Sequence, residues 1–269
     1  MNDRAKKLTD KGIKTLVESL NRGQSDTLKA YLATMAKFHR YSWHNCLLIW
    51  LQCPTATQVA GFKKWLNLGR CVKKGERGIM ILAPMAYTRR VDPDPHSEQS
   101  DGTEKKLPTS MFIAAWVFDV SQTEGRELPE IGKRSGDPGI FQDRLLDFAK
   151  SKGIAVSRVD DLNGAKGVSK GGSIAVLSRL DAAESFGILV HEIAHELLHQ
   201  GDNKGCKPRA VRELEAEATA YVVCEAIGLA DCSAASDYIQ LYQGDSKLMM
   251  ASLSSIQKAS AMILKEILD

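Results

Sequence analysis

Residues 188–198 read Ile-Leu-Val-His-Glu-Ile-Ala-His-Glu-Leu-Leu, a run with one apolar face at helical spacing that carries two histidines four positions apart. An α-helix places residues i and i+4 one turn apart on the same face, so His191 and His195 can direct imidazole nitrogens at one point, as a zinc ion requires. Glu192 lies beside them. The pattern predicts a metal-binding helix in which Glu192 is the catalytic general base.

A third ligand must come from elsewhere, because catalytic zinc normally takes three protein ligands and leaves a fourth position for water. The helical run after the motif has Glu213 and Glu217 on a shared face, whereas Glu215 points roughly opposite. We assign Glu213 as the third ligand and Glu217 as the acceptor of a histidine N–H, with Glu217 as ligand the main alternative. His199 falls about 80° around the helix from the first histidine and is predicted to support the site.

Peptide-bond hydrolysis is the expected chemistry. A bound Zn²⁺, or another divalent metal such as Mn²⁺, would polarise the carbonyl and lower the pKa of a water towards about 7, and Glu192 would take the water proton and pass it to the leaving amine. Tyr221 or His199 is expected to stabilise the oxyanion. The strand 173–177, exposed at a sheet edge, is expected to align an unknown protein substrate by backbone pairing.

Charge divides the chain unevenly, although the net charge is only +3. Residues 1–91 hold 17 Lys and Arg against 5 Asp and Glu, whereas the remaining residues hold 19 against 28. The basic part predicts contact with a polyanion.

Aromatic residues lie among these cations, a pattern typical of nucleic-acid binding, and stacking on a base requires an unpaired strand. Single-stranded DNA is therefore the predicted partner. The alternative is that Trp43, Phe62 and Trp65 are core residues and the charges a solvated face. The residues expected to contact DNA are Trp43, Asn45, Lys63, Lys64, Trp65, Arg70, Lys73, Lys74 and Arg77.

Two families share these motifs. The two-helix pattern, from His191 to Glu217, resembles the gluzincin peptidases of the compact IrrE and ImmA type, in which the second helix has Glu and, four residues on, Asn or Asp. In the basic part, Ser42 and Asn45, Gln52 and Pro54, residues 61–65 and residues 69–78 resemble the N-terminal domain of ArdC-type antirestriction proteins. The resemblance covers nearly the whole chain. It implies single-stranded DNA binding and protection of incoming plasmid DNA from host restriction.

The predicted fold is α+β with two domains, the second a compact zincin-like metallopeptidase fold. We expect a basic DNA-binding domain over 1–125, a linker over 126–138 where Gly, Pro and alternating charges lack periodicity, and the metallopeptidase domain over 139–269. Two helices are expected to open the chain, over 4–21 and 25–51. The polar insert 92–108 is expected to be an exposed hairpin loop.

Composition indicates a cytoplasmic protein. No run of eighteen apolar residues exists, the N-terminus lacks an apolar signal core, and no membrane partner is expected. The six cysteines show no paired two-residue spacing and are expected to be free thiols.

Two other functions fit the same residues. The chain would then be either a DNA-binding protein whose metal site is structural or vestigial, or a DNA-gated protease that cleaves a repressor. The role of Glu192 separates the first of these from a peptidase.

Overall fold

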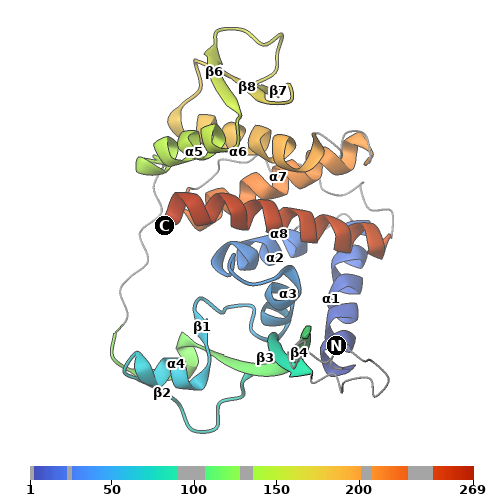
Figure 1. Ribbon diagram of the computed structural model, residues 1–269, viewed down its shortest axis with the longest axis vertical. Helices are drawn as coiled ribbons and strands as arrows, with labels where there is room; N and C mark the ends of the chain where they lie inside the picture. The colour runs from blue at the N-terminus through green and yellow to red at the C-terminus, as the bar shows by residue number, and fades with distance from the viewer. Residues whose placement is uncertain (1–2, 23–25, 90–106, 128–135, 201–206, 230–244) are drawn as a thin grey trace, which may run out of the picture.

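The computed structural model describes residues 3–22, 26–89, 107–127, 136–200, 207–229 and 245–269. The fold is α+β. Three helices, α6, α7 and α8, lie across the middle of the molecule, with a small sheet above them and the N-terminal helices and a long hairpin below (Figure 1). The elements are α1 (Asp3–Asn21), α2 (Asp26–Lys37), α3 (Trp43–Gln52), β1 (Val59–Ala60), α4 (Phe62–Asn67), β2 (Arg70–Val72), β3 (Ile79–Arg89), β4 (Leu107–Asp119), β5 (Thr123–Gly125), α5 (Ile140–Ser151), β6 (Ala155–Val159), β7 (Gly167–Ser169), β8 (Ser173–Leu177), α6 (Ala182–His199), α7 (Arg209–Ala226) and α8 (Ser246–Leu268).

Three helices, rather than the two expected, open the chain. The predicted helix over 25–51 is wrong because the chain leaves the helix after Lys37 and starts again at Trp43. Ser42 causes the restart: its backbone is extended and its side chain accepts the backbone N–H of Asn45, which caps α3.

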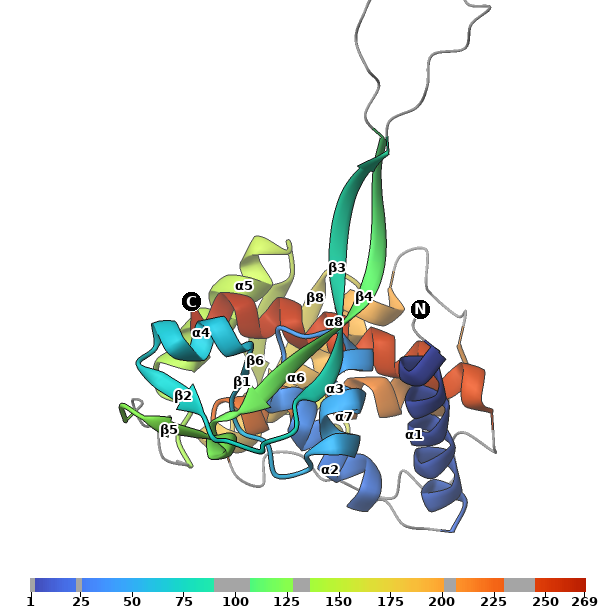
Figure 2. The same cartoon turned by 90° about the horizontal axis from the view of Figure 1, so that it is seen from below.

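Helix α3 takes the place of a neighbouring strand along one edge of β3. The Asn45 side-chain amide exchanges two hydrogen bonds with the backbone of Leu82, both 2.8 Å, and Gln52 does the same with Met80 at 2.9 and 3.0 Å. On its other edge β3 pairs with β4 in antiparallel register, Met80 opposite Trp116. The hairpin of β3 and β4 extends away from the helices (Figure 2). Of the insert 92–108, residues 92–106 lie outside the described residues.

The small sheet has the order β6-β8-β7, so the expectation that residues 173–177 form an edge strand is wrong. Strand β8 is central, parallel to β6 and antiparallel to β7. Glycine-rich turns join these strands, so that β6 and β7 both precede β8 in the sequence and both pair with it. The alternation of apolar residues does not show which of the three strands is central. The strand that packs beside α6 at the edge is β7.

One hydrophobic core joins the two predicted domains. Helix α2 packs on α7, and α1 and α3 contact α8, so that residues from Ile13 to Ile267 belong to the same buried cluster. Separate cores for 1–125 and 139–269 are therefore not found among the described residues, and residues 128–135 of the predicted linker lie outside them.

Four cysteines are described, and all four are free thiols: Cys46, Cys53, Cys71 and Cys224. Cys206 and Cys232 lie outside the described residues. None of the described helices has the length and apolar character needed to cross a membrane.

Candidate functional site

Helix α6 carries the His-Glu-Ile-Ala-His motif on the border of its buried face. Asp181 caps the helix by accepting the backbone N–H of Glu184 at 2.8 Å. Phe186, Leu189, Val190 and Ile193 are at most 2% exposed and fix the rotation of the helix against the core. This rotation leaves His191 and His195 partly exposed on the side that faces α7.

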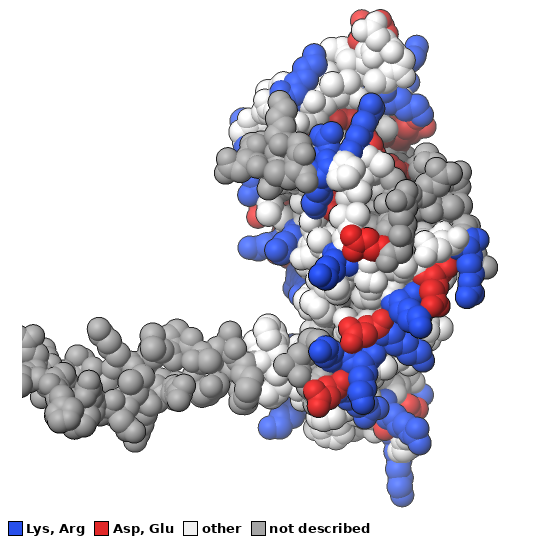
Figure 3. All heavy atoms as spheres, turned by 90° about the vertical axis from the view of Figure 1, so that its right-hand side faces the viewer, with Lys and Arg blue, Asp and Glu red and all other residues white. Residues whose placement is uncertain are grey.

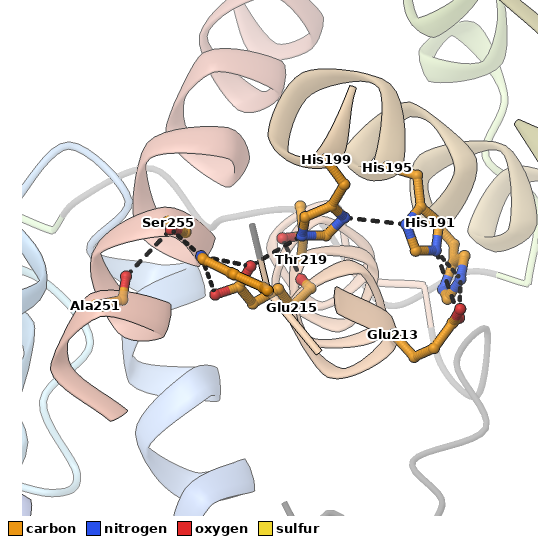
Figure 4. Close-up of polar contacts among 9 residues, drawn as sticks. His191, His195, His199, Glu213, Glu215, Thr219, Ala251 and Ser255 are labelled. Atoms are coloured by element: carbon orange, nitrogen blue, oxygen red, sulfur yellow. Dashed lines mark hydrogen bonds and ion pairs between the residues drawn. The ribbon is translucent and has the colours of Figure 1, made fainter. Parts of the chain in front are cut away.

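Three donor atoms converge on one point between α6 and α7. Nε2 of His191 and Nε2 of His195 are 3.1 Å apart, and Oε2 of Glu213 lies 3.6 Å from the first and 3.4 Å from the second (Figure 4). Ligand atoms at about 2.1 Å from a tetrahedral ion are about 3.4 Å from one another. Among the described residues, these three form the one group with metal-binding geometry, and the triangle fits a small divalent cation.

The remaining ring nitrogen of His191 is held by Glu217, whose Oε2 lies 3.1 Å from Nδ1. Glu217 therefore orients the histidine and lies behind the donor triangle, whereas Glu213 faces it. Burial lowers the pKa of His191, but hydrogen bonds to Glu213 and Glu217 outweigh burial and raise it to about 9. Hydrogen bonds from the two histidines hold the pKa of Glu213 well below its usual range. Without a metal ion, the protonated imidazole of His191 supplies the positive charge beside the carboxylates of Glu213 and Glu217.

Glu192 is 8% exposed and lies beneath β7. Strand β7 approaches it closely because residue 167 is glycine: a Cβ there would lie 2.6 Å from Cγ2 of Ile188 and 2.9 Å from Cγ of Glu192. Burial raises the pKa of Glu192, against the opposing effect of the two histidines. A carboxylate with a raised pKa beside a metal centre is suited to accept and return a proton near neutral pH.

Glu196, the residue after the motif, fastens the turn between β7 and β8 to α6. Its carboxylate accepts the hydroxyl of Ser169 at 2.6 Å and the backbone N–H groups of Gly171 and Gly172 at 2.9 and 2.7 Å. Both glycines have positive φ, the conformation that aims two successive N–H groups at one carboxylate. Glu196 thus fixes the edge strand over the site, a role that the spacing of the motif did not reveal.

A second missed residue is Glu215, which is fully buried between His199 and Lys207. Its Oε2 lies 2.9 Å from Nε2 of His199, and Lys207 Nζ lies 2.6 Å from its Oε1. On the other side of the ring, Nδ1 of His199 lies 3.0 Å from Nδ1 of His195. Lys207 Nζ also donates to the hydroxyl of Ser255 on α8 at 3.2 Å, so hydrogen bonds lead from α8 through Lys207, Glu215 and His199 to the donor triangle (Figure 4).

Proton positions in this chain follow from the ionised carboxylate, which only accepts. His199 donates its Nε2–H to Glu215, so its Nδ1 accepts the Nδ1–H of His195. A metal ion would replace the hydrogen bond that His195 otherwise donates to Glu213, and the lone pair of Nε2 would then face the ion. His199 is 2% exposed and both its nitrogens are used. The expectation that it might stabilise an oxyanion is therefore wrong, and Tyr221 remains a prediction for that role.

The comparisons with known proteins bear on both parts of the chain. Residues 2–118 match the model of the ArdcN family, the N-terminal domain of anti-restriction factor ArdC. A crystal structure of the antirestriction ArdC protein from plasmid R388 with Mn(II) bound has the same fold, with a TM-score of 0.58 and 18% identity over 97% of this chain and 98% of that one. Residues 2–118 therefore match an ArdcN domain, and the whole chain shares the fold of the R388 ArdC protein.

Two further proteins are similar to this chain. The metal-free structure of the R388 ArdC protein gives a TM-score of 0.52 and 19% identity over 84% of each chain. An uncharacterised protein of Bacillus anthracis, pXO2-81, is 26% identical over 250 residues, which is 76% of this chain and 41% of that protein. The chain therefore spans about two fifths of the length of this curated relative.

Several residues of the ArdcN domain that were predicted to contact DNA are structural. Trp43 and Trp65 are 7% and 2% exposed, and the Trp65 indole donates to the backbone of Phe118 at 2.8 Å. Asn45 is buried and pairs with β3. The Arg70 guanidinium donates to the Thr123 hydroxyl and to the backbone carbonyls of Thr123, Gly125 and Arg126, so most of its N–H groups already hold β2 to β5 and the residue that follows it. For these four residues the structure contradicts the prediction, because Trp43 is buried and the polar groups of Asn45, Trp65 and Arg70 form hydrogen bonds within the fold.

Other predicted residues of the ArdcN domain remain exposed: Lys63, Lys64, Lys73, Lys74 and Arg77. They lie on α4 and on the loop between β2 and β3. Exposed aromatic rings were missed on β4, where Trp116 is 55% and Phe112 56% exposed. The alternation of the strand places both on one face, but the sequence did not indicate which face other elements would cover.

Proposed function

We propose that this ArdC-type chain binds single-stranded DNA and carries a zinc-dependent peptidase-type site, and that it protects incoming plasmid DNA from host restriction. The observation that carries the proposal is the donor triangle of His191, His195 and Glu213 with Glu192 buried beside it. We further propose that the second half is zincin-like, with the domain boundary within 126–138.

The residues fit a divalent cation, and each has a distinct task. A bound cation supplies Lewis acidity to a water molecule and to the substrate carbonyl. Glu192 takes the proton from the water at its carboxylate and delivers it to the leaving nitrogen. Glu217 and His199 hold the two imidazoles at Nδ1, which aims both Nε2 atoms at the cation. Zn²⁺ suits a set of two imidazoles and one carboxylate, and Mn²⁺, present in the R388 structure, is the alternative.

Strand β7 replaces β8 as the element proposed to align an extended protein substrate. It is an edge strand, it lies over α6, and its turn is fastened by Glu196. An added strand at its open edge would run past Glu192.

The metal assignment predicts that His191→Ala removes stoichiometric metal, because one of three donors and its support from Glu217 are lost. Metal content after dialysis, measured by inductively coupled plasma mass spectrometry, checks this. The matched control is His44→Ala, which should keep its metal. His44 stacks on Trp43 and is far from the donor triangle along the chain. Retention of full metal by His191→Ala would show that the ligand set is wrong.

The same centre predicts that metal affinity rises with pH. The pKa of His191 near 9 exceeds that of an unfolded histidine, so the metal-free protein is stabilised by this proton below about pH 6.5 and loses the effect as pH rises through 9. A metal ion must displace the proton. Calorimetric titration at pH 7 in buffers of different ionisation enthalpy should therefore report proton release, and its absence would mean that His191 is not protonated in the free site.

The DNA assignment predicts that the chain prefers single-stranded over duplex oligonucleotides, and that Lys73→Glu combined with Lys74→Glu weakens binding by at least about tenfold at low salt. Filter binding with a labelled thymidine 20-mer measures both effects. Lys258→Glu with Lys265→Glu on α8 changes the charge equally at exposed positions outside the ArdcN domain. Equal affinity for duplex, or equal loss in the two double variants, would contradict a specific basic surface.

A further inference from the structure

A cavity of about 460 Å³ lies between α1 and the end of α3, and it is lined mainly by cations. Arg4, Lys7 and Lys11 follow one another at helical spacing along α1, and Gln52 closes the opposite side. No carboxylate lines it among the residues that the structure describes. Figure 3 views the side of the molecule that carries α1, where Lys and Arg side chains gather over the lower half with a few acidic residues between them.

The cavity adjoins the face of the hairpin that carries the exposed aromatic rings. Leu8 lines the cavity and also packs with Met80, Leu82 and Ala114 in a small cluster of its own. Because Gln52 uses the N–H and C=O of Met80, Met80 and Trp116 form a pair without mutual hydrogen bonds, in which side chains approach most closely. Trp116 therefore lies on the face of the hairpin that carries Met80, the face on which Leu8 of the cavity packs, with β3 between it and Gln52.

The aromatic rings lie on both sides of the point where α1 meets β4. Phe112, Ala114 and Trp116 share a face; Ala114 is covered by the Leu8 cluster, and the two rings are left exposed at 56% and 55%. Four strand residues separate the rings by about 13 Å. Flat exposed rings beside a row of cations can bind a strand whose bases are unpaired, whereas the bases of a duplex are stacked inside.

Trp116 also lies close to the loop that holds Lys73, Lys74 and Arg77. Gly78 follows this loop, and a Cβ at Gly78 would lie 3.0 Å from Cβ of Trp116, so the loop passes directly against the tryptophan. The indole thus lies between two basic regions that are far apart in the sequence.

From this arrangement we propose that α1 and the Phe112–Trp116 face form one track for single-stranded DNA, with phosphates at Arg4, Lys7 and Lys11 and bases stacked on Trp116 and Phe112. The inference rests on the proposed single-stranded DNA binding and assigns it a path. Charge favours this occupant over an apolar protein segment, because such a segment would take water away from the Lys7 and Lys11 ammonium groups without offering them an anion.

The test compares Lys7→Glu with Lys6→Glu in the full chain. The two lysines are neighbours on α1, both are exposed, and the charge change is identical, but only Lys7 lines the cavity. Anisotropy of a labelled thymidine 20-mer should show affinity reduced about tenfold for Lys7→Glu and little changed for Lys6→Glu. Trp116→Ala should reduce affinity at least about fivefold, the loss expected for one stacked base.

Intrinsic fluorescence gives a second measurement that a purely structural role would not change. Trp116 is much more exposed than Trp43 or Trp65, so the oligonucleotide should quench wild-type emission and leave that of Trp116→Phe nearly unchanged, while Phe preserves most of the affinity. Circular dichroism confirms that each variant is folded.

Three results would overturn the track. Equal losses for Lys6→Glu and Lys7→Glu would indicate general electrostatic attraction. Unchanged binding in Lys7→Glu and Trp116→Ala, together with loss in the Lys73 and Lys74 double variant, would place the DNA on the loop alone. Absence of binding by the wild-type chain would refute the proposed function itself and the track with it.

Discussion

Glu192→Gln is expected to abolish proteolysis and to leave the metal in place. The amide keeps the shape of the side chain, and its oxygen can still accept the backbone hydrogen bond that Ser169 of β7 donates to Glu192, but it cannot take a proton from water. Loss of general base catalysis corresponds to a fall in rate of about 100- to 10,000-fold. Because burial already raises the pKa of this carboxyl, the neutral amide should not destabilise the fold.

Mass spectrometry of protein fragments from cells that carry the wild-type or the Glu192→Gln chain measures the effect and identifies the substrate. Glu184→Gln is the control, since Glu184 lies two turns earlier on α6 and forms an exposed ion pair with Lys166. Fragments that persist in Glu192→Gln would argue against a peptidase. If protection of a transferred plasmid survives the substitution while fragments vanish, proteolysis is not the means of protection.

Glu215→Ala is expected to have the largest effect on stability, about 3 kcal/mol, because His199 and Lys207 lose their common partner in a buried position. Metal affinity should also fall, by about 10- to 100-fold, because the Nδ1 proton of His195 is no longer directed by the chain through His199. Chemical denaturation and competition with a chelator measure the two effects.

Val223→Ala provides the matched control, since Val223 is fully buried on the same helix, two turns further on, and is not part of the histidine chain. It should lower stability without a change in metal affinity. Glu215→Gln, which keeps an acceptor for His199, should recover most of the affinity while remaining less stable. Equal metal affinity in Glu215→Ala and Val223→Ala would mean that Glu215 serves the fold alone.

The convergence of His191, His195 and Glu213 was largely predictable because it depends on spacing within helices. His191 and His195, or Glu213 and Glu217, share faces at any position of a helix in space. The role of Glu215 was missed because it depends on contacts between helices. Its position on α7 excludes it from the donor triangle, and His199 lies opposite it because α6 packs on α7.

The polar residues of the basic part have structural roles that composition could not predict. Asn45 and Gln52 were visible as motif residues, yet their amides serve as backbone substitutes for β3, a use that depends on where a strand 28 or more residues later is placed. Trp65 and Arg70 fill similar roles at β4 and β5. The excess of cations in residues 1–91 pointed to a polyanion, but it could not distinguish cations that hold the fold from cations on an open surface.

The packing of α2 against α7 has a consequence for the two proposed activities. Helix α7 carries Glu213 and Glu217 on the side that contacts the motif histidines of α6, and it also packs against α2. The two activities therefore share a single unfolding equilibrium. Metal bound at one end raises the population of folded protein available to DNA at the other, and substitutions that weaken either end act on both through the amount of folded chain.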